Sequence, residues 1–276
     1  MVDIAPSAWK IGYEDRILML GSCFSDEIGE QMKQRELNVT CNPFGTLYNP
    51  ISIAQAINSK LSTLNSQLIF HDGLWHSMFH HGSFSRADKH EAEQAVADSI
   101  QTMQQALKDA SVIIVTFGTA WVYEMVNGTC PNGKWIVGNC HKLPESMFTR
   151  RRLSVDEIVA AWRPILDRYP DKHWLFTVSP IRHIKDGLHE NQLSKATLLQ
   201  AIECLGDYFP SYEIVLDELR DYRFYADDLV HPSSLAVQYV WERFAETFCT
   251  PQTRNEMNIR LKHWKQTQHR PLHHIQ

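Results

Sequence analysis

Three short runs of apolar residues, each followed by Gly or Ser, constrain the fold of this 276-residue chain most strongly. An unbroken apolar run, as over 17–20, is typical of a strand buried on both faces in a parallel sheet covered by helices. The other two runs are 112–117, which includes Thr116, and 173–178, which includes His173 and Thr177. Segments with the apolar spacing of helices lie between and after them, over 51–64, 89–109, 153–169, 193–205 and 234–248. This alternation predicts an α/β fold with a parallel sheet of about five strands.

Two further strands and one insertion complete the predicted domain. Val39 and Cys41 indicate a short second strand, and residues 212–217 are predicted to form the last strand of the sheet. Asp72-Gly73 between short alternating runs predicts a β-hairpin in an insertion over about 65–90. Asn-Gly pairs at 127–128 and 132–133 suggest further hairpins or loops. We expect a single domain over 1–250 and a polar helical tail over 251–276.

Composition narrows the class of protein and its partners. The net charge of −5 and pI near 6.3 provide no basic field, so we expect no nucleic-acid partner. No apolar run approaches the roughly 20 residues that span a bilayer, and no signal peptide is visible. The six cysteines lack C-x-x-C spacing, which favours reduced thiols in the cytoplasm. Eight Trp and fourteen His favour a small-molecule or carbohydrate ligand, and the oligomeric state stays open.

The turn after the first apolar run is the first candidate site. Ser22 follows Gly21 at the end of the predicted strand, and Ser25 and Asp26 are suitable for the start of a helix. The carboxyl edge of an open α/β sheet is where ligands bind, and the helix dipole there favours negative charge. Ser22 is therefore either a nucleophile or an ordinary helix cap. Cys23 is expected to point away from it as a buried thiol.

Asp228 and His231, in D-D-L-V-H-P, form the second candidate pair. A carboxylate that accepts from one imidazole nitrogen fixes the tautomer and leaves the other nitrogen to take a proton from a hydroxyl. Such a pair is also common on protein surfaces. Together with Gly-Ser after the first strand, it gives a candidate Ser-His-Asp set.

Five motifs in this order resemble the GSCFA-domain family, which is similar to SGNH (GDSL-like) hydrolases. They are G-S-C-F-S, N-P-F-G-T-L-Y-N-P, F-G-T-A-W-V-Y, S-P-I-R-H-I-K-D-G and D-D-L-V-H-P-S-S. The resemblance implies a three-layer α/β/α, flavodoxin-like fold. It also implies a serine hydrolase or acyltransferase acting on an O-acyl ester, in particular an O-acetyl group on a carbohydrate, without a cofactor. Ser22 then resembles the nucleophile, His231 the base, Asp228 its orienting carboxylate and Gly45 an oxyanion-hole amide.

The third motif departs from the SGNH pattern, because Trp121 stands where that pattern has an Asn donor. The backbone N–H groups of Ser22 and Gly45 supply two expected oxyanion donors, and Thr119 is the first candidate for a third. The other candidates are Asn42, His80 and His81. Trp121 is expected to form a pocket wall against a sugar, with the pair Arg182 and His183 binding an anionic or hydroxylated substrate.

Two alternatives to the serine enzyme remain from the sequence. The missing Asn is compatible with a weak or inactive carbohydrate-binding module. The i, i+4 spacing of His76 and His80 is compatible with a metal-assisted hydrolase. Because only Asp72 is a nearby carboxylate, we expect a pocket-lining hairpin and no metal.

Overall fold

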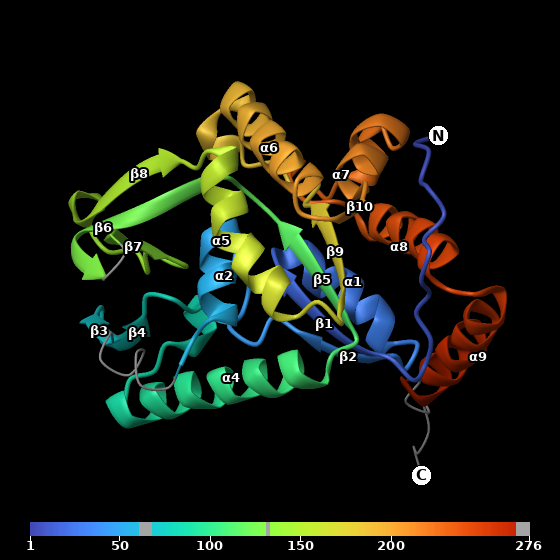
Figure 1. The fold of residues 1–276 in the computed structure, drawn as a ribbon, viewed down its shortest axis with the longest axis horizontal. Helices are drawn as coiled ribbons and strands as arrows, with labels where there is room; N and C mark the ends of the chain where they lie inside the picture. The colour runs from blue at the N-terminus through green and yellow to red at the C-terminus, as the bar shows by residue number, and fades with distance from the viewer. Residues whose placement is uncertain (61–67, 131–132, 269–276) are drawn as a thin grey trace, which may run out of the picture.

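The computed structural model describes residues 1–60, 68–130 and 133–268, and it has a parallel sheet at its centre (Figure 1). The five strands lie in the order β10-β9-β5-β1-β2. They are β1 (Arg16–Gly21), β2 (Asn38–Cys41), β5 (Val112–Phe117), β9 (His173–Val178) and β10 (Asp207–Phe209). The predicted α/β class with a five-stranded parallel sheet is confirmed.

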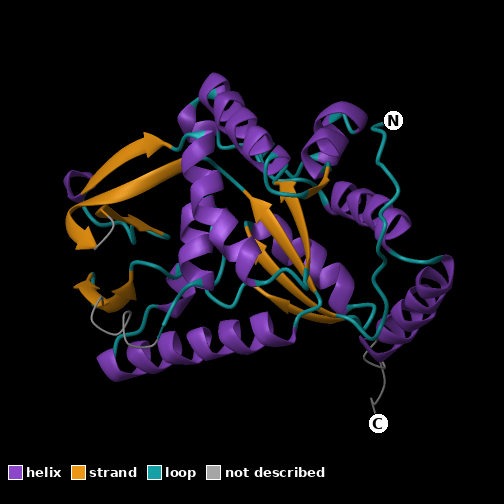
Figure 2. Cartoon of the chain, viewed as in Figure 1, coloured by secondary structure: helices purple, strands orange, loops and turns teal. Residues whose placement is uncertain are grey.

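Helices cover both faces of this sheet, which makes a three-layer α/β/α arrangement (Figure 2). Side chains alternate along β1: Leu18 and Leu20 join one apolar cluster, whereas Ile17 and Met19 join the other. The first cluster packs under α2 (Pro50–Ile57), α4 (Lys89–Asp109), α5 (Val155–Arg168) and α6 (Leu188–Glu203). The second packs under α1 (Cys23–Lys33), α8 (Ser234–Phe248) and α9 (Pro251–Gln268).

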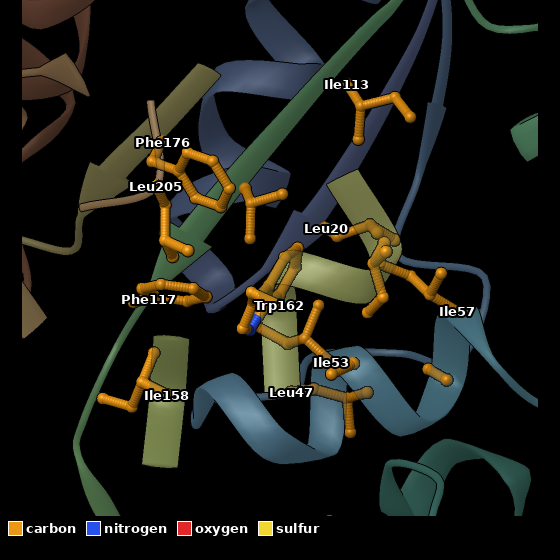
Figure 3. Packing of buried hydrophobic residues seen from close by; sticks show 14 of the residues in the cluster. Leu20, Leu47, Ile53, Ile57, Ile113, Phe117, Ile158, Trp162, Phe176 and Leu205 are labelled. Carbon is orange, nitrogen blue, oxygen red and sulfur yellow. The ribbon is translucent and has the colours of Figure 1, made fainter. Parts of the chain in front are cut away.

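The centre of the first cluster is Trp162 of α5 (Figure 3). Its ring lies edge-on to Phe117 and Phe176, at centroid distances of 5.3 and 5.4 Å, and its indole N–H donates to the Pro50 carbonyl at 3.1 Å. The predicted capping box of this helix is present, because Ser154 and Glu157 each accept from the other's backbone N–H. These contacts fix α5 and α2 against β5 and β9.

The prediction of a last strand over 212–217 is wrong. These residues lie in α7 (Ser211–Glu213) and in the π-helical turn η4 (Ile214–Glu218), and the fifth strand is β10, just before Pro210. Ile214 and Val215 are buried in the second cluster. A short apolar run is equally compatible with a strand and with a buried helical turn, and the packing against α8 decides between them.

Two antiparallel insertions extend beyond the main sheet. The predicted hairpin forms between β3 (Leu68–His71) and β4 (Leu74–Ser77), with Asp72 and Gly73 at φ of 49° and 75°. A second insertion between β5 and α5 is a three-stranded sheet in the order β7-β6-β8. Its strands are β6 (Trp121–Cys130), β7 (Gly133–Val137) and β8 (Phe148–Arg152). The sequence indicated hairpins or loops here and did not predict the arginine-rich β8.

The helix boundaries differ from prediction mainly at their ends. α1 begins at Cys23 with Ser22 as N-cap residue, so Ser25 lies inside the first turn and is not the cap. α6 begins at Leu188, earlier than predicted. The predicted ends at 61–64 and 269–276 lie outside the described residues. Short 3-10 turns are η1 (Gly82–Phe84), η2 (Glu145–Met147), η3 (Ile184–Asp186) and η5 (Tyr222–Phe224). Within the described ranges, no helix combines the length and apolarity needed to cross a membrane.

Candidate functional site

The candidate site lies at the carboxyl edge of the parallel sheet, where three central strands end in small residues. Gly21 ends β1, Gly118 follows β5, and Ser179 follows β9. Because the strands are parallel neighbours in the order β9-β5-β1, these three residues lie on one edge. Ligands bind at this edge in open α/β sheets.

The turn from β1 into α1 requires a glycine. Gly21 has a φ of 132°, and a Cβ built on it would lie 2.1 Å from the Thr116 carbonyl oxygen of β5. The loop after β2 holds the turn from the other side. The N–H of Gly21 donates to Oδ1 of Asn42 at 2.8 Å, and its carbonyl accepts from the N–H of Leu47 at 3.0 Å. The backbone direction of Ser22 and Cys23 is therefore fixed by β5 and by this loop.

Ser22, the predicted nucleophile, is only 1 % exposed. Its hydroxyl oxygen is fully covered and makes no hydrogen bond to any described residue, so it neither caps α1 nor contacts a histidine. Its backbone N–H, a predicted oxyanion donor, donates to the Thr116 carbonyl at 3.3 Å. Ser25 has the structural role expected of a buried serine, since its hydroxyl bonds to Thr116 Oγ1 at 2.8 Å.

Cys23 is the first residue of α1, and its side chain is partly exposed. The expectation of a buried thiol is thus only partly met. Partial burial raises the pKa of the Cys23 thiol, while the backbone N–H groups of Cys23 and Phe24 act in the opposite direction. The resting group is a neutral thiol beside a helix N-terminus.

The predicted contact between Asp228 and His231 is present. Nδ1 of His231 lies 2.6 Å from Oδ2 of Asp228, and the carboxylate accepts because it carries no proton. Its other oxygen accepts from the backbone N–H groups of Val230 at 2.9 Å and His231 at 3.0 Å. These hydrogen bonds lower the pKa of Asp228 to about 2. The tautomer of His231 is therefore fixed with Nδ1 protonated and Nε2 as the basic nitrogen.

Three predicted oxyanion donors are engaged elsewhere in the fold. The N–H of Gly45 donates to the Asn42 carbonyl at 2.7 Å, and this turn requires the positive φ of 72° that Gly45 adopts. The hydroxyl of Thr119 lies 3.1 Å from Ser194 Oγ and accepts from the N–H of Trp121. The side-chain amide of Asn42 donates to Asp26 at 2.8 Å. The Gly45 N–H and the Asn42 amide are thus engaged as donors, and the Thr119 hydroxyl is held in a contact with Ser194 in which either oxygen can donate.

The hairpin histidines are also engaged. His80 is fully buried, and its two ring nitrogens bond to the hydroxyls of Ser77 and Ser99 at 2.7 and 2.8 Å. Burial lowers its pKa to about 3, so it stays neutral. His81 accepts from the N–H of Ser83 and caps a 3-10 turn. In the part of the chain that the structure describes, no three His, Cys, Asp or Glu side chains are grouped to hold a metal ion.

The predicted substrate-binding residues Trp121, Arg182 and His183 lie near the same edge. Trp121 stacks under the Arg150 guanidinium, whose carbon lies 4.2 Å from the ring centroid. Its indole N–H is buried and has no hydrogen-bond partner among the described residues. The backbone N–H of Arg182 donates to the Val230 carbonyl at 3.4 Å, which places its strand end beside the His231 loop.

His183 connects this loop with the centre of the edge. Its ring lies edge-on to Tyr48 at 6.2 Å, and the backbone carbonyl of Tyr48 accepts from the N–H of Gly118 at 2.8 Å. Burial lowers the pKa of His183 to about 4, and the positive charges of Lys195 and His231 act in the same direction. His183, Lys195 and His231 therefore interact electrostatically at one edge of the sheet.

Lys195 is a residue of this edge that the sequence analysis missed. It is 1 % exposed, and its ammonium donates to the Gly118 and Ser179 carbonyls, both at 2.7 Å. It forms no ion pair with a carboxylate of the described residues. Burial lowers its pKa to about 7, and a thiolate at Cys23 would act in the opposite direction. Lys195 shares the buried face of α6 with Asn191, Leu198 and Ile202, and this helical spacing was a visible signal.

A comparison with protein-family models supports the resemblance noted from the motifs. The model of the GSCFA family matches residues 16–244, which includes β1, the whole parallel sheet and most of α8. A comparison with curated proteins finds no match. Since the matched region covers well over half of the chain and contains every residue of the candidate site, this protein belongs to the GSCFA family.

Proposed function

We propose that the protein catalyses acyl transfer from an O-acyl ester, as a hydrolase or an O-acyltransferase, through a covalent acyl-enzyme. The observation that carries the proposal is the oriented pair of Asp228 and His231 at the carboxyl edge, where β1 ends and α1 begins with Ser22 and Cys23. The resemblance of the motifs to SGNH hydrolases supports the same reaction class.

In this mechanism the two side chains of the pair have different tasks. Asp228 stays ionised at neutral pH because its pKa is about 2, and it holds the proton on Nδ1 of His231. Nε2 then accepts the proton of the nucleophile and later delivers it to the leaving alkoxide. The nucleophile comes from the turn 21–23, which joins β1 to α1.

The oxyanion of the tetrahedral intermediate needs preorganised donors. The first N–H groups of a helix have no partners within the helix, so the N-terminus of α1 is a source of such donors. The indole N–H of Trp121, at the position where an Asn donor was expected, also lacks a described partner, but its nitrogen is as fully covered as the Ser22 hydroxyl. We assign the oxyanion to the first N–H groups of α1, because the Gly45 N–H is engaged with Asn42.

Aromatic and cationic side chains around the edge suit a hydroxylated acceptor. Trp121 with Arg150 forms a flat surface, and Arg182 lies 4.3 Å above the Tyr225 ring. Sugars stack on such surfaces through their apolar faces. We therefore propose an acylated carbohydrate, O-acetylated in the simplest case, as the substrate class.

The test measures release of acetate from para-nitrophenyl acetate and from acetylated sugars by the wild type and by His231→Ala. We expect turnover by the wild type and a loss of about 10³-fold or more in kcat/KM for the variant. His263→Ala, at an exposed histidine of α9, is the matched control and should keep full activity. Absence of turnover by the wild type, or equal activity of His231→Ala, would refute the proposal.

One observation favours a second function, a carbohydrate-binding module without turnover. The Ser22 hydroxyl is covered, and the predicted donors Gly45 and Thr119 are engaged. Calorimetric titration with the same sugars decides between the two functions. Binding without release of acetate would support the module.

A further inference from the structure

We propose that the thiol of Cys23, and not the hydroxyl of Ser22, is the nucleophile of this site. The inference rests on the proposed acyl transfer and names the atom that forms the covalent bond.

The accessibility of the two neighbouring side chains is the first argument. Ser22 is 1 % exposed, and its oxygen is fully covered and bonds to none of the residues that the structure describes. A nucleophile must reach a carbonyl carbon and must give its proton to a base, and this oxygen has access to neither solvent nor base. The Cys23 side chain is partly exposed on the same turn.

The hydrogen-bonded backbone of the turn prevents a rotation that would expose the Ser22 side chain in place of the Cys23 side chain. The Ser22 N–H is bonded to Thr116, and the Ser22 carbonyl accepts from the N–H of Ser25 at 2.8 Å. Any Cβ on Gly21 would collide with the Thr116 carbonyl, so the strand cannot rotate about this point without losing its pairing to β5. Ser22 is held inward, whereas Cys23 begins the helix partly exposed and partly packed against the second apolar cluster.

Two features beside Cys23 stabilise a negative charge there, although burial and the carboxylates of Asp26 and Glu27 raise the pKa of its thiol in the resting state. It occupies the first position of α1, where the helix dipole and the free N–H groups stabilise an anion. The ammonium of Lys195, fixed by Gly118 and Ser179 at the ends of β5 and β9, supplies a positive charge without a described carboxylate partner. Attraction between a Cys23 thiolate and this ammonium acts with the two carbonyl acceptors to support the charged form of Lys195 against burial. Both features stabilise a thiolate during attack.

A base is present on the same side of the molecule. Tyr48, whose pKa is raised by burial with a smaller contribution from Cys23, lies edge-on to His183. Next to His183, the N–H of Arg182 donates to the carbonyl of Val230, which precedes His231. The loop of the oriented histidine therefore lies at the sheet edge where Cys23 begins α1, whereas the Ser22 hydroxyl bonds to no described residue.

The chemistry then follows in two balanced halves. Nε2 of His231 takes the Sγ proton of Cys23, sulfur bonds to the ester carbonyl carbon, and the carbonyl electron pair moves to oxygen. The intermediate collapses, the C–O bond to the leaving alkoxide breaks, and His231 returns the proton to that oxygen, leaving a thioester on Cys23. Water or an acceptor hydroxyl then gives its proton to His231 and attacks the thioester, and the departing thiolate regains the proton.

The test combines active-site labelling with paired variants of the full chain. Wild type, Ser22→Ala, Cys23→Ala and Cys204→Ala are incubated with para-nitrophenyl acetate. The acetyl group is then located by fragmentation of the tryptic peptide 17–33, which contains both candidate residues. Cys204 is an exposed thiol at the end of α6, so its labelling defines the background reaction of a surface cysteine. Circular dichroism and thermal unfolding verify that each variant is folded.

We expect acetyl on Cys23 well above the Cys204 background, with rapid release by neutral hydroxylamine, as is typical of a thioester. Cys23→Ala should lose about 10³-fold or more in kcat/KM, whereas Ser22→Ala and Cys204→Ala should stay within about tenfold of the wild type. Acetyl on Ser22, or an inactive, folded Ser22→Ala beside an active Cys23→Ala, would overturn the inference and leave acyl transfer intact. If the wild type neither turns over esters nor becomes labelled above background, the proposed function itself fails.

Discussion

Replacing Lys195 by Met should change how the free energy of unfolding depends on pH. The buried ammonium has a pKa of about 7, against 10.5 for an ordinary lysine. Between these two pH values the unfolded chain binds one proton more than the native protein, so the free energy of unfolding rises with pH. The native state is penalised in full below about pH 7, and the penalty disappears above pH 10.5.

The magnitude follows from the size of the pKa shift. One pKa unit corresponds to about 1.4 kcal/mol, so the penalty is about 4 kcal/mol at pH 7 and about 1 kcal/mol at pH 10. The variant lacks this penalty but leaves the Gly118 and Ser179 carbonyls without their donor. Each unsatisfied carbonyl costs roughly 1–3 kcal/mol at every pH. Near pH 7, Lys195→Met should therefore have a free energy of unfolding similar to that of the wild type. Between pH 7 and pH 10 the wild type should gain about 3 kcal/mol relative to the variant.

Urea unfolding of both proteins at pH 7, 8, 9 and 10 measures this difference. Other titrating groups change both proteins alike, and their effect cancels when the two curves are subtracted. Lys262→Met, at an exposed lysine of α9, is the matched control and should show a difference that is independent of pH. A constant difference between wild type and Lys195→Met across the range would mean that Lys195 titrates normally, and the reasoning would be refuted.

Three further outcomes are expected. Asp228→Asn should lower kcat by up to about 10⁴-fold if the carboxylate fixes the tautomer of His231, and an unchanged kcat would remove it from that role. Gly21→Ala should lower the free energy of unfolding in urea by more than about 3 kcal/mol, because the new Cβ would collide with the Thr116 carbonyl. A urea midpoint close to that of the wild type would contradict this account of the turn. A chelator should leave ester turnover unchanged. Loss of turnover in the presence of the chelator would support the metal-assisted alternative that uses the hairpin histidines.

Local sequence signals were sufficient wherever short-range physics decides the structure. The runs 17–20 and 112–117 form buried parallel strands because continuous apolar residues require cover on both faces. Asp72-Gly73 forms a hairpin turn because both residues adopt positive φ. The contact between Asp228 and His231 closes over three residues, within the reach of one loop. These features depend on neighbours in the chain, so the sequence predicted them.

Tertiary packing decided the features that depend on distant residues. Residues 212–217 are helical and not extended because Ile214 and Val215 pack below α8. Thr119 and His80 resemble free donors in the sequence, but Ser194 and Ser99, from helices distant in the chain, occupy them.

The candidate nucleophile shows the same division between sequence and structure most clearly. The sequence by itself determines that Gly21, Ser22 and Cys23 end a buried strand and begin a helix, because an apolar run, a glycine and first-turn acids are local signals. Which side chain of the turn is accessible depends on the Thr116 carbonyl of β5 and on the loop that carries Asn42 and Leu47. Those contacts form only when the sheet is assembled, and they cover Ser22 while leaving Cys23 partly exposed.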